Sequence, residues 1–170
     1  QVARAGEQVV RAASQLEGDL RRAGFVTMEN TRLVDLAQRT DVRLLVTSEV
    51  NGDVYQLDRL CNAARAAGAV AVLVLGNLGY RPGWEGEEFL NRADDTARAH
   101  GVEVWFMDGT RDHLDALTAQ RRGYPGPMAV RPLVWHMPRG QRLTLAGVDV
   151  GFVGGGFSPD WRQRQFGTDV

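Results

Sequence analysis

Hydrophobic residues near the start of the chain recur at helical spacing. Between residues 2 and 23 they stand three or four positions apart, with arginine and acidic residues between them: Val2, Ala5, Val9, Ala12, Leu16 and Leu20. This spacing predicts an amphipathic helix, and Gly24 stands where a helix C-cap is expected. A second short helix is predicted around residues 33–37. We therefore expect residues 1–40 to form a helical extension.

From Asp41 onward, short apolar runs alternate with amphipathic segments. Strands are predicted at residues 43–48, 69–75 and 102–107, since such runs are typical of buried strands. Between them the pattern predicts helices: one capped by Asp53 and closed by Gly68, one closed by Gly101, and one that carries Leu114 and Leu117. Because parallel neighbouring strands need a crossover connection, this alternation predicts parallel βαβ units.

The pattern of apolar runs changes after Gly123. Three further strands are predicted at residues 133–137, 141–145 and 148–153, separated by short turns that contain Pro or Gly. Such closely spaced strands are typical of an antiparallel meander. The sequence thus predicts an α/β domain over residues 41–170, with a βαβ half followed by a β-rich half.

Composition adds little about partners. The chain has 170 residues, 44% of them hydrophobic, and a formal net charge of -1, which suits one domain with a buried core. Nothing indicates binding to nucleic acid or to a membrane, no segment approaches a membrane span, and a cytoplasmic location is expected. The only cysteine, Cys61, lies on an apolar helical face and is predicted to be a buried, inert thiol.

Polar residues beside glycine follow each of the first three predicted strands. They occupy residues 48–53, 76–79 and 108–113. In an open α/β sheet, ligands bind beyond the carboxyl ends of the strands. The sequence therefore predicts a functional site where these three segments meet.

These segments resemble the motifs of the calcineurin-like metallophosphoesterase family, which are Asp-x-His, Gly-Asp and Gly-Asn-His-Asp/Glu at successive strand ends. Glu49 and Asn51 stand at the positions of the first Asp and His, and Asn77 stands at that of the metal-bridging Asp. Thr110 and Arg111 stand at the positions of the third motif's Asn and His. Residues 137–140 and 154–160 also resemble the family, so the resemblance covers about residues 41–160. It implies a metallophosphoesterase-like α/β sandwich.

The departures fall on the positions that would hold metal. The resemblance implies two metal ions ~4 Å apart that share the bridging carboxylate, and the neutral Asn77 cannot offset their repulsion. The amide of Asn51 is a poor ligand for transition metals, Thr110 is too short, and Glu49 carries its carboxylate one methylene further out. We predict that the metal site is lost. No cofactor is expected; if one binds, it is a single divalent ion (manganese, magnesium, iron or zinc).

The catalytic candidates implied by the resemblance are Arg111, at the family's general-acid position, with Asp112 and His113 beside it. Arginine does not release its proton near neutral pH, so Arg111 either pairs with Glu49 or holds a phosphate, and His113 is the remaining candidate acid. The family's later histidine motifs do not appear before Val170, so a C-terminally truncated version of the fold is expected. Elsewhere, His100 is predicted near a helix end and His136 in a strand, as a packing residue.

The leading hypothesis is a catalytically inactive metallophosphoesterase-like domain that serves as a binding or scaffold module. The alternative is a weakly active phosphoesterase, a hydrolase that uses one divalent ion held by Glu49, Asp112 and water. In a third hypothesis the helix at residues 2–23 covers sheet surface or pairs with another chain. Residues 1–40 are thus a candidate surface for a protein partner, and a phosphorylated small molecule is a candidate ligand.

Overall fold

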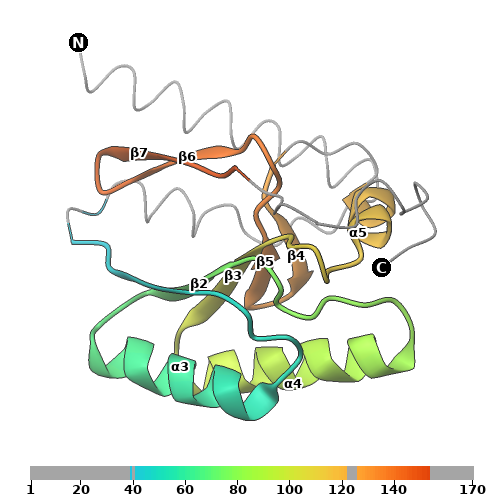
Figure 1. The fold of residues 1–170 in the computed structure, drawn as a ribbon. Coiled ribbons are helices and arrows are strands. Elements are labelled where there is room, and N and C mark those ends of the chain that lie inside the picture. Colours follow the sequence, from blue (N-terminus) through green and yellow to red (C-terminus); the bar gives the residue numbers. More distant parts are fainter. Residues whose placement is uncertain (1–38, 40, 122–125, 154–170) are drawn as a thin grey trace, which may run out of the picture. The chain divides into compact units, whose positions relative to one another are not determined.

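The computed structural model describes residue 39, residues 41–121 and residues 126–153 (Figure 1). The predicted extension at residues 1–40 lies almost entirely outside the described residues, as do the family-like residues 154–160. The described residues divide into a larger unit, residues 42–143 and 149–153, and a smaller one that includes Thr144–Val148. The candidate site lies wholly in the larger unit.

The larger unit is built on a five-stranded sheet with the strand order β1-β2-β3-β5-β4. Its strands are β1 (Leu44–Thr47), β2 (Ala71–Leu75), β3 (Glu103–Met107), β4 (Met128–Arg131) and β5 (Val134–His136). β1, β2, β3 and β5 run parallel to one another, and β4 pairs antiparallel with β5. The predicted α/β class with parallel βαβ units is confirmed.

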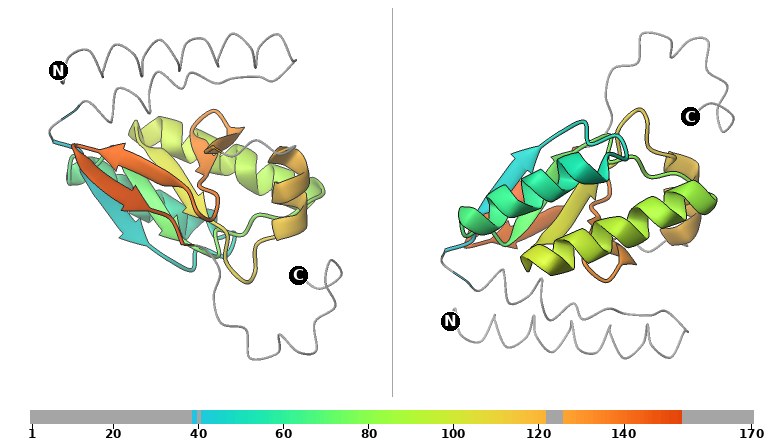
Figure 2. Two further views of the ribbon diagram at one scale, coloured as in Figure 1. Left: turned by 90° about the horizontal axis from the view of Figure 1, so that it is seen from above. Right: turned by 90° about the horizontal axis from the view of Figure 1, so that it is seen from below.

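Two helices, α3 (Val54–Ala66) and α4 (Trp84–His100), lie side by side on one face of this sheet (Figure 2). The carboxylate of Asp53 caps α3 by accepting a hydrogen bond of 3.0 Å from the backbone N–H of Gln56, and Gly101 ends α4 in the left-handed conformation. Both caps agree with the sequence. α4 begins at Trp84, earlier than its apolar pattern indicates.

The core lies between these helices and the sheet. Its fully buried members on the strands are Val72, Val74, Val104, Phe106 and Val134, and they meet Leu57, Cys61, Leu90 and Ala93 from the helices. Cys61 is buried, as predicted. A shorter helix, α5 (Leu114–Arg121), follows the loop after β3 and buries Leu117.

The predicted three-stranded meander is wrong in its pairing. β5 runs parallel to β3, with Trp105 beside Trp135, because α5 and the unpredicted strand β4 together return the chain to the edge of the parallel sheet. β6 (Arg142–Leu145) and β7 (Val148–Gly151) form a separate two-stranded sheet. Their two-residue connection, Ala146 and Gly147, has positive φ at both positions, as a type I′ hairpin turn requires.

No helix among the described residues is both long enough and apolar enough to cross a membrane.

Candidate functional site

The loops that follow β1, β2 and β3 lie together at one edge of the sheet. Because the three strands are parallel neighbours, their carboxyl ends meet. Backbone bonds tie the loops: the N–H of Asn51 donates to the carbonyl of Asn77 at 2.8 Å, and the N–H of His113 donates to the carbonyl of Tyr80 at 3.0 Å. The structure therefore brings together the three segments that the sequence singled out.

The side chain of Asn77 joins all three loops. Its Nδ2 donates to Oε1 of Glu49 at 2.6 Å, and its Oδ1 accepts the backbone N–H of Arg111 at 2.9 Å. A backbone N–H can only donate, so the atom that faces Arg111 is the amide oxygen and the nitrogen faces Glu49. The amide thus donates on one side and accepts on the other, whereas an ionised carboxylate can only accept, so aspartate could not take this place without a proton or a cation.

Glu49 accepts a hydrogen bond on each of its carboxylate oxygens. Besides Asn77 on Oε1, the Nδ2 of Asn51 donates to Oε2 at 3.2 Å and to the backbone carbonyl of Glu49 at 3.1 Å. The hydrogen bonds from Asn77 and Asn51 lower the pKa of Glu49; burial opposes this shift, and the positive charge of Arg111 adds a lesser lowering. These donors favour the ionised carboxylate.

The backbone at these positions is unusual. Glu49, Asn51 and Asn77 have φ values of 60°, 53° and 57°, and Ala146 is the only other non-glycine residue with positive φ in the part of the chain that the structure describes. Left-handed backbone is uncommon for residues other than glycine, and it clusters at functional sites. Three of the predicted metal-binding positions thus share a strained conformation that the sequence alone does not reveal.

Gly109 fits directly against Asn77. A Cβ atom at position 109 would lie 2.2 Å from Oδ1 of Asn77 and 2.4 Å from its backbone nitrogen. Gly79 is similarly constrained, since a Cβ there would lie 2.3 Å from the backbone nitrogen of Gly52. The loops approach one another so closely that only glycine fits at these two contacts.

Asp112 fastens the second and third loops together. Its Oδ1 accepts the backbone N–H groups of Gly79 and Tyr80, both at 2.8 Å, and its Oδ2 accepts the N–H of Gly109 at 2.9 Å. The carboxylate is buried. The sequence placed Asp112 among the catalytic candidates and offered it as a metal ligand; its three backbone hydrogen bonds describe a residue that holds the loops in position.

The remaining predicted residues lie in the third loop. Thr110 is half-buried between Gly109 and Arg111. Arg111 is exposed, and its guanidinium makes no ion pair with Glu49 or with any other described side chain, although its charge acts on Glu49. The Nδ1 of His113 accepts the backbone N–H of Ala116 at 3.2 Å, so this nitrogen is occupied at the start of α5.

A charged cluster centred on the buried Asp108, which the sequence did not indicate, lies beside the loops. Asp108, at the end of β3, pairs with Nε2 of His136 at 3.3 Å and with Nε of Arg139 at 2.7 Å. Burial acts to raise the pKa of Asp108, but the hydrogen bonds from His136 and Arg139 and their charges outweigh it and lower this pKa. His136 does pack against Phe106, with ring centroids 5.1 Å apart, as predicted, and also binds this carboxylate. Pairing across the sheet, which no local pattern shows, brings these residues together.

As they are arranged, the side chains of this site do not direct suitable ligand atoms toward a metal ion. Asn77 directs N–H hydrogens, not lone pairs, at the carboxylate of Glu49, and its oxygen is used by Arg111. Cations require lone pairs from oxygen, nitrogen or sulfur. In the described portion of the chain, no group of three or more His, Cys, Asp or Glu residues is arranged to hold a metal.

No protein-family model matches this chain, and no curated protein matches it.

Proposed function

We propose that this chain is a metallophosphoesterase-like domain that binds a partner or ligand without hydrolysing it. The family resemblance rests on the loop motifs and on the order of strands and helices, and the α/β architecture agrees with it. The observation that carries the proposal is the Asn77 amide. It links Glu49 to the backbone of Arg111 directly, so the three loops are held together by the chain's own hydrogen bonds.

The other changed positions support the same proposal. Arg111 offers a permanent cation that neither donates nor accepts a proton near neutral pH, so it does not replace a general acid. Asp112 is committed to three backbone N–H groups, and turning its carboxylate toward a metal ion would take it away from these donors. Breaking such bonds costs about 1–3 kcal/mol for each buried donor, which disfavours the one-metal phosphoesterase.

The proposal is tested on the full chain by measuring bound metal, thermal stability and phosphodiester hydrolysis on one preparation. We expect no turnover of a chromogenic phosphodiester with manganese, and the same melting temperature in manganese and in chelator. Metal-dependent turnover that Glu49→Ala abolishes would overturn the proposal in favour of the weakly active hydrolase.

Asn77→Asp gives a sharper comparison. The substitution places a second carboxylate against Glu49 and removes the N–H donor, so we expect a lower melting temperature that manganese partly restores. Asn62→Asp makes the same chemical change on an exposed turn of α3, and manganese should not affect it. If Asn77→Asp melts like the unmodified chain in chelator, the amide is not what holds these loops.

A further inference from the structure

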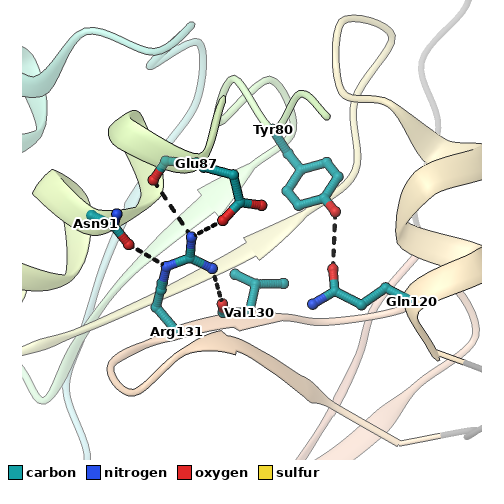
Figure 3. A network of polar contacts seen from close by, with 6 residues as sticks. All are labelled: Tyr80, Glu87, Asn91, Gln120, Val130 and Arg131. Carbon is teal, nitrogen blue, oxygen red and sulfur yellow. Dashed lines mark hydrogen bonds and ion pairs between the residues drawn. The ribbon is translucent and has the colours of Figure 1, made fainter. Parts of the chain in front are cut away.

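The two edges of the five-stranded sheet are built differently. At the β4 edge the pairing with β5 shifts register between Ala129 and Arg131. The guanidinium of Arg131 then bonds to Oδ1 of Asn91 at 2.7 Å, to the carbonyl of Val130 at 2.6 Å and to the carboxylate of Glu87 (Figure 3). Bulges and edge charges of this kind prevent further strand pairing.

In the part of the chain that the structure describes, the β1 edge has no such protection. All four residues of β1 pair in unbroken register with β2, and Leu44–Thr47 contains neither proline nor a charged residue. Among the described residues no strand lies beyond β1. A regular, apolar edge strand is a template for pairing with another chain.

The hydrogen bonds of β1 show which of its peptide groups face outward. The carbonyl of Arg43 accepts from Val70, and the N–H of Glu49 donates to Gly76, so the odd-numbered residues face β2. In an extended strand the peptide groups alternate in direction from one residue to the next. The N–H and C=O groups of Leu44 and Val46 therefore point away from β2, toward the open edge.

The same edge exposes apolar side chains. Val46 is 56% exposed and Leu75 of the neighbouring strand is 51% exposed. Val46 pairs with Leu73, and Leu75 lies two residues further along, so Val46 and Leu75 share one face of the sheet. Parallel sheets are normally covered on both faces, which makes this apolar surface a candidate for burial by a partner.

We propose that β1 pairs antiparallel with β1 of a second copy of this chain, with Val46 opposite Val46 of that copy. Outward-facing residues must oppose one another in an antiparallel ladder, so even-numbered residues pair only with even-numbered ones. Centring the pair on Val46 sets Leu44 opposite Ser48 and brings Arg43 near Glu49 of the second copy, just beyond the paired residues.

Charge favours this register over its neighbours. The twofold axis brings Arg43 and Glu49 together twice, just beyond the ends of the paired strands, and opposite charges there attract. Arg43 bonds the carbonyl of Ala67 through Nη1 at 3.1 Å and keeps its other N–H donors for this contact. If the twofold axis passed through Leu45 instead, Arg43 would lie opposite the uncharged Thr47. If it passed through Thr47, Glu49 would lie opposite the apolar Leu45. Because only a few residues pair, we expect a reversible, concentration-dependent dimer.

Cysteine cross-linking tests the register. At the twofold axis the Cα atoms of a hydrogen-bonded pair lie about 5.5 Å apart, within the range that a disulfide spans, so Val46→Cys should give a disulfide-linked dimer on mild oxidation. The two copies of Leu44 would lie about 13 Å apart along the strands, so Leu44→Cys, on the same face, should not cross-link. The native Cys61 is buried and does not compete.

Light scattering across a range of concentrations tests the dimer itself. We expect the unmodified chain and Val46→Thr to approach the mass of two chains, and Val46→Lys to remain at the mass of one because two cations would meet at the axis. Val46 is largely exposed, so at dilutions where all three are monomeric they should melt at similar temperatures. A monomer at every concentration, or cross-linking by Leu44→Cys as efficient as that by Val46→Cys, would overturn the proposal.

Discussion

Removing the carboxylate of Asp112 should destabilise the domain far more than removing a neighbouring carboxylate. Asp112 is 4% exposed and accepts three backbone N–H groups, those of Gly79, Tyr80 and Gly109. Asp112→Ala leaves these three donors without their acceptor. Asp115→Ala removes the same group from an exposed position in the first turn of α5, so it is the matched control.

The size of the effect follows from the three bonds. A buried donor left without a partner costs about 1–3 kcal/mol, which gives about 3–9 kcal/mol for three. The site lies at the surface edge of the sheet, so water can reach part of the vacated space, and we expect a loss of about 3–5 kcal/mol. This is a large share of the ~5–15 kcal/mol that stabilises a typical domain. Asp115→Ala should stay within about 0.5 kcal/mol of the unmodified chain.

Urea unfolding followed by circular dichroism measures both variants. A true change in stability lowers the midpoint with little change in slope. If Asp112→Ala and Asp115→Ala shift the midpoint equally, the carboxylate of Asp112 does not hold the loops, and a role in binding or chemistry regains support.

Three further predictions concern single positions. Gly109→Ala should cost about 1–3 kcal/mol from overpacking against Asn77, whereas Gly151→Ala, with no atom within 4 Å of the new Cβ, should be nearly neutral in thermal melts; equal shifts would contradict the close contact. The pKa of Asp108 is lowered in the fold, so the stability that Asp108 contributes is present above its unfolded pKa of 3.8 and is lost as pH falls through the lowered folded pKa. The urea midpoint should therefore fall less steeply with acid in Asp108→Asn than in the unmodified chain. Parallel plots of midpoint against pH for the two proteins would count against the ion pair. Burial raises the pKa of Cys61 to about 12, so the native thiol should resist alkylation until urea unfolds the chain, and rapid native labelling would reveal local opening.

Local sequence signals specified the elements of the parallel half. Each of these signals acts within a few residues of its own position. They are the apolar runs that became β1, β2 and β3, the capping carboxylate of Asp53 and the terminating Gly101. Parallel strands then place their carboxyl ends at one edge, so the sequence also indicated that residues 48–53, 76–79 and 108–113 would meet.

Only the tertiary structure decided how strands pair in the second half. The run that became β5 has the same apolar character whether it pairs parallel or antiparallel, and its place beside β3 depends on packing against residues ~30 positions away. For the same reason the cluster of Asp108, His136 and Arg139 was not foreseen, because its members come from separate loops and strands.

For the candidate site, too, the sequence indicated the residues, and only the structure showed their interactions. The resemblance to the metallophosphoesterase motifs singled out Glu49, Asn51, Asn77, Thr110 and Arg111 in the sequence, and the expectation that they hold metal poorly follows from the chemistry of the side chains themselves. What those side chains do instead is a matter of distance and direction. The sequence does not contain the 2.6 Å bond from Asn77 to Glu49 or the three backbone donors that converge on Asp112, because hydrogen bonds between loops exist only once the sheet has brought the loops together.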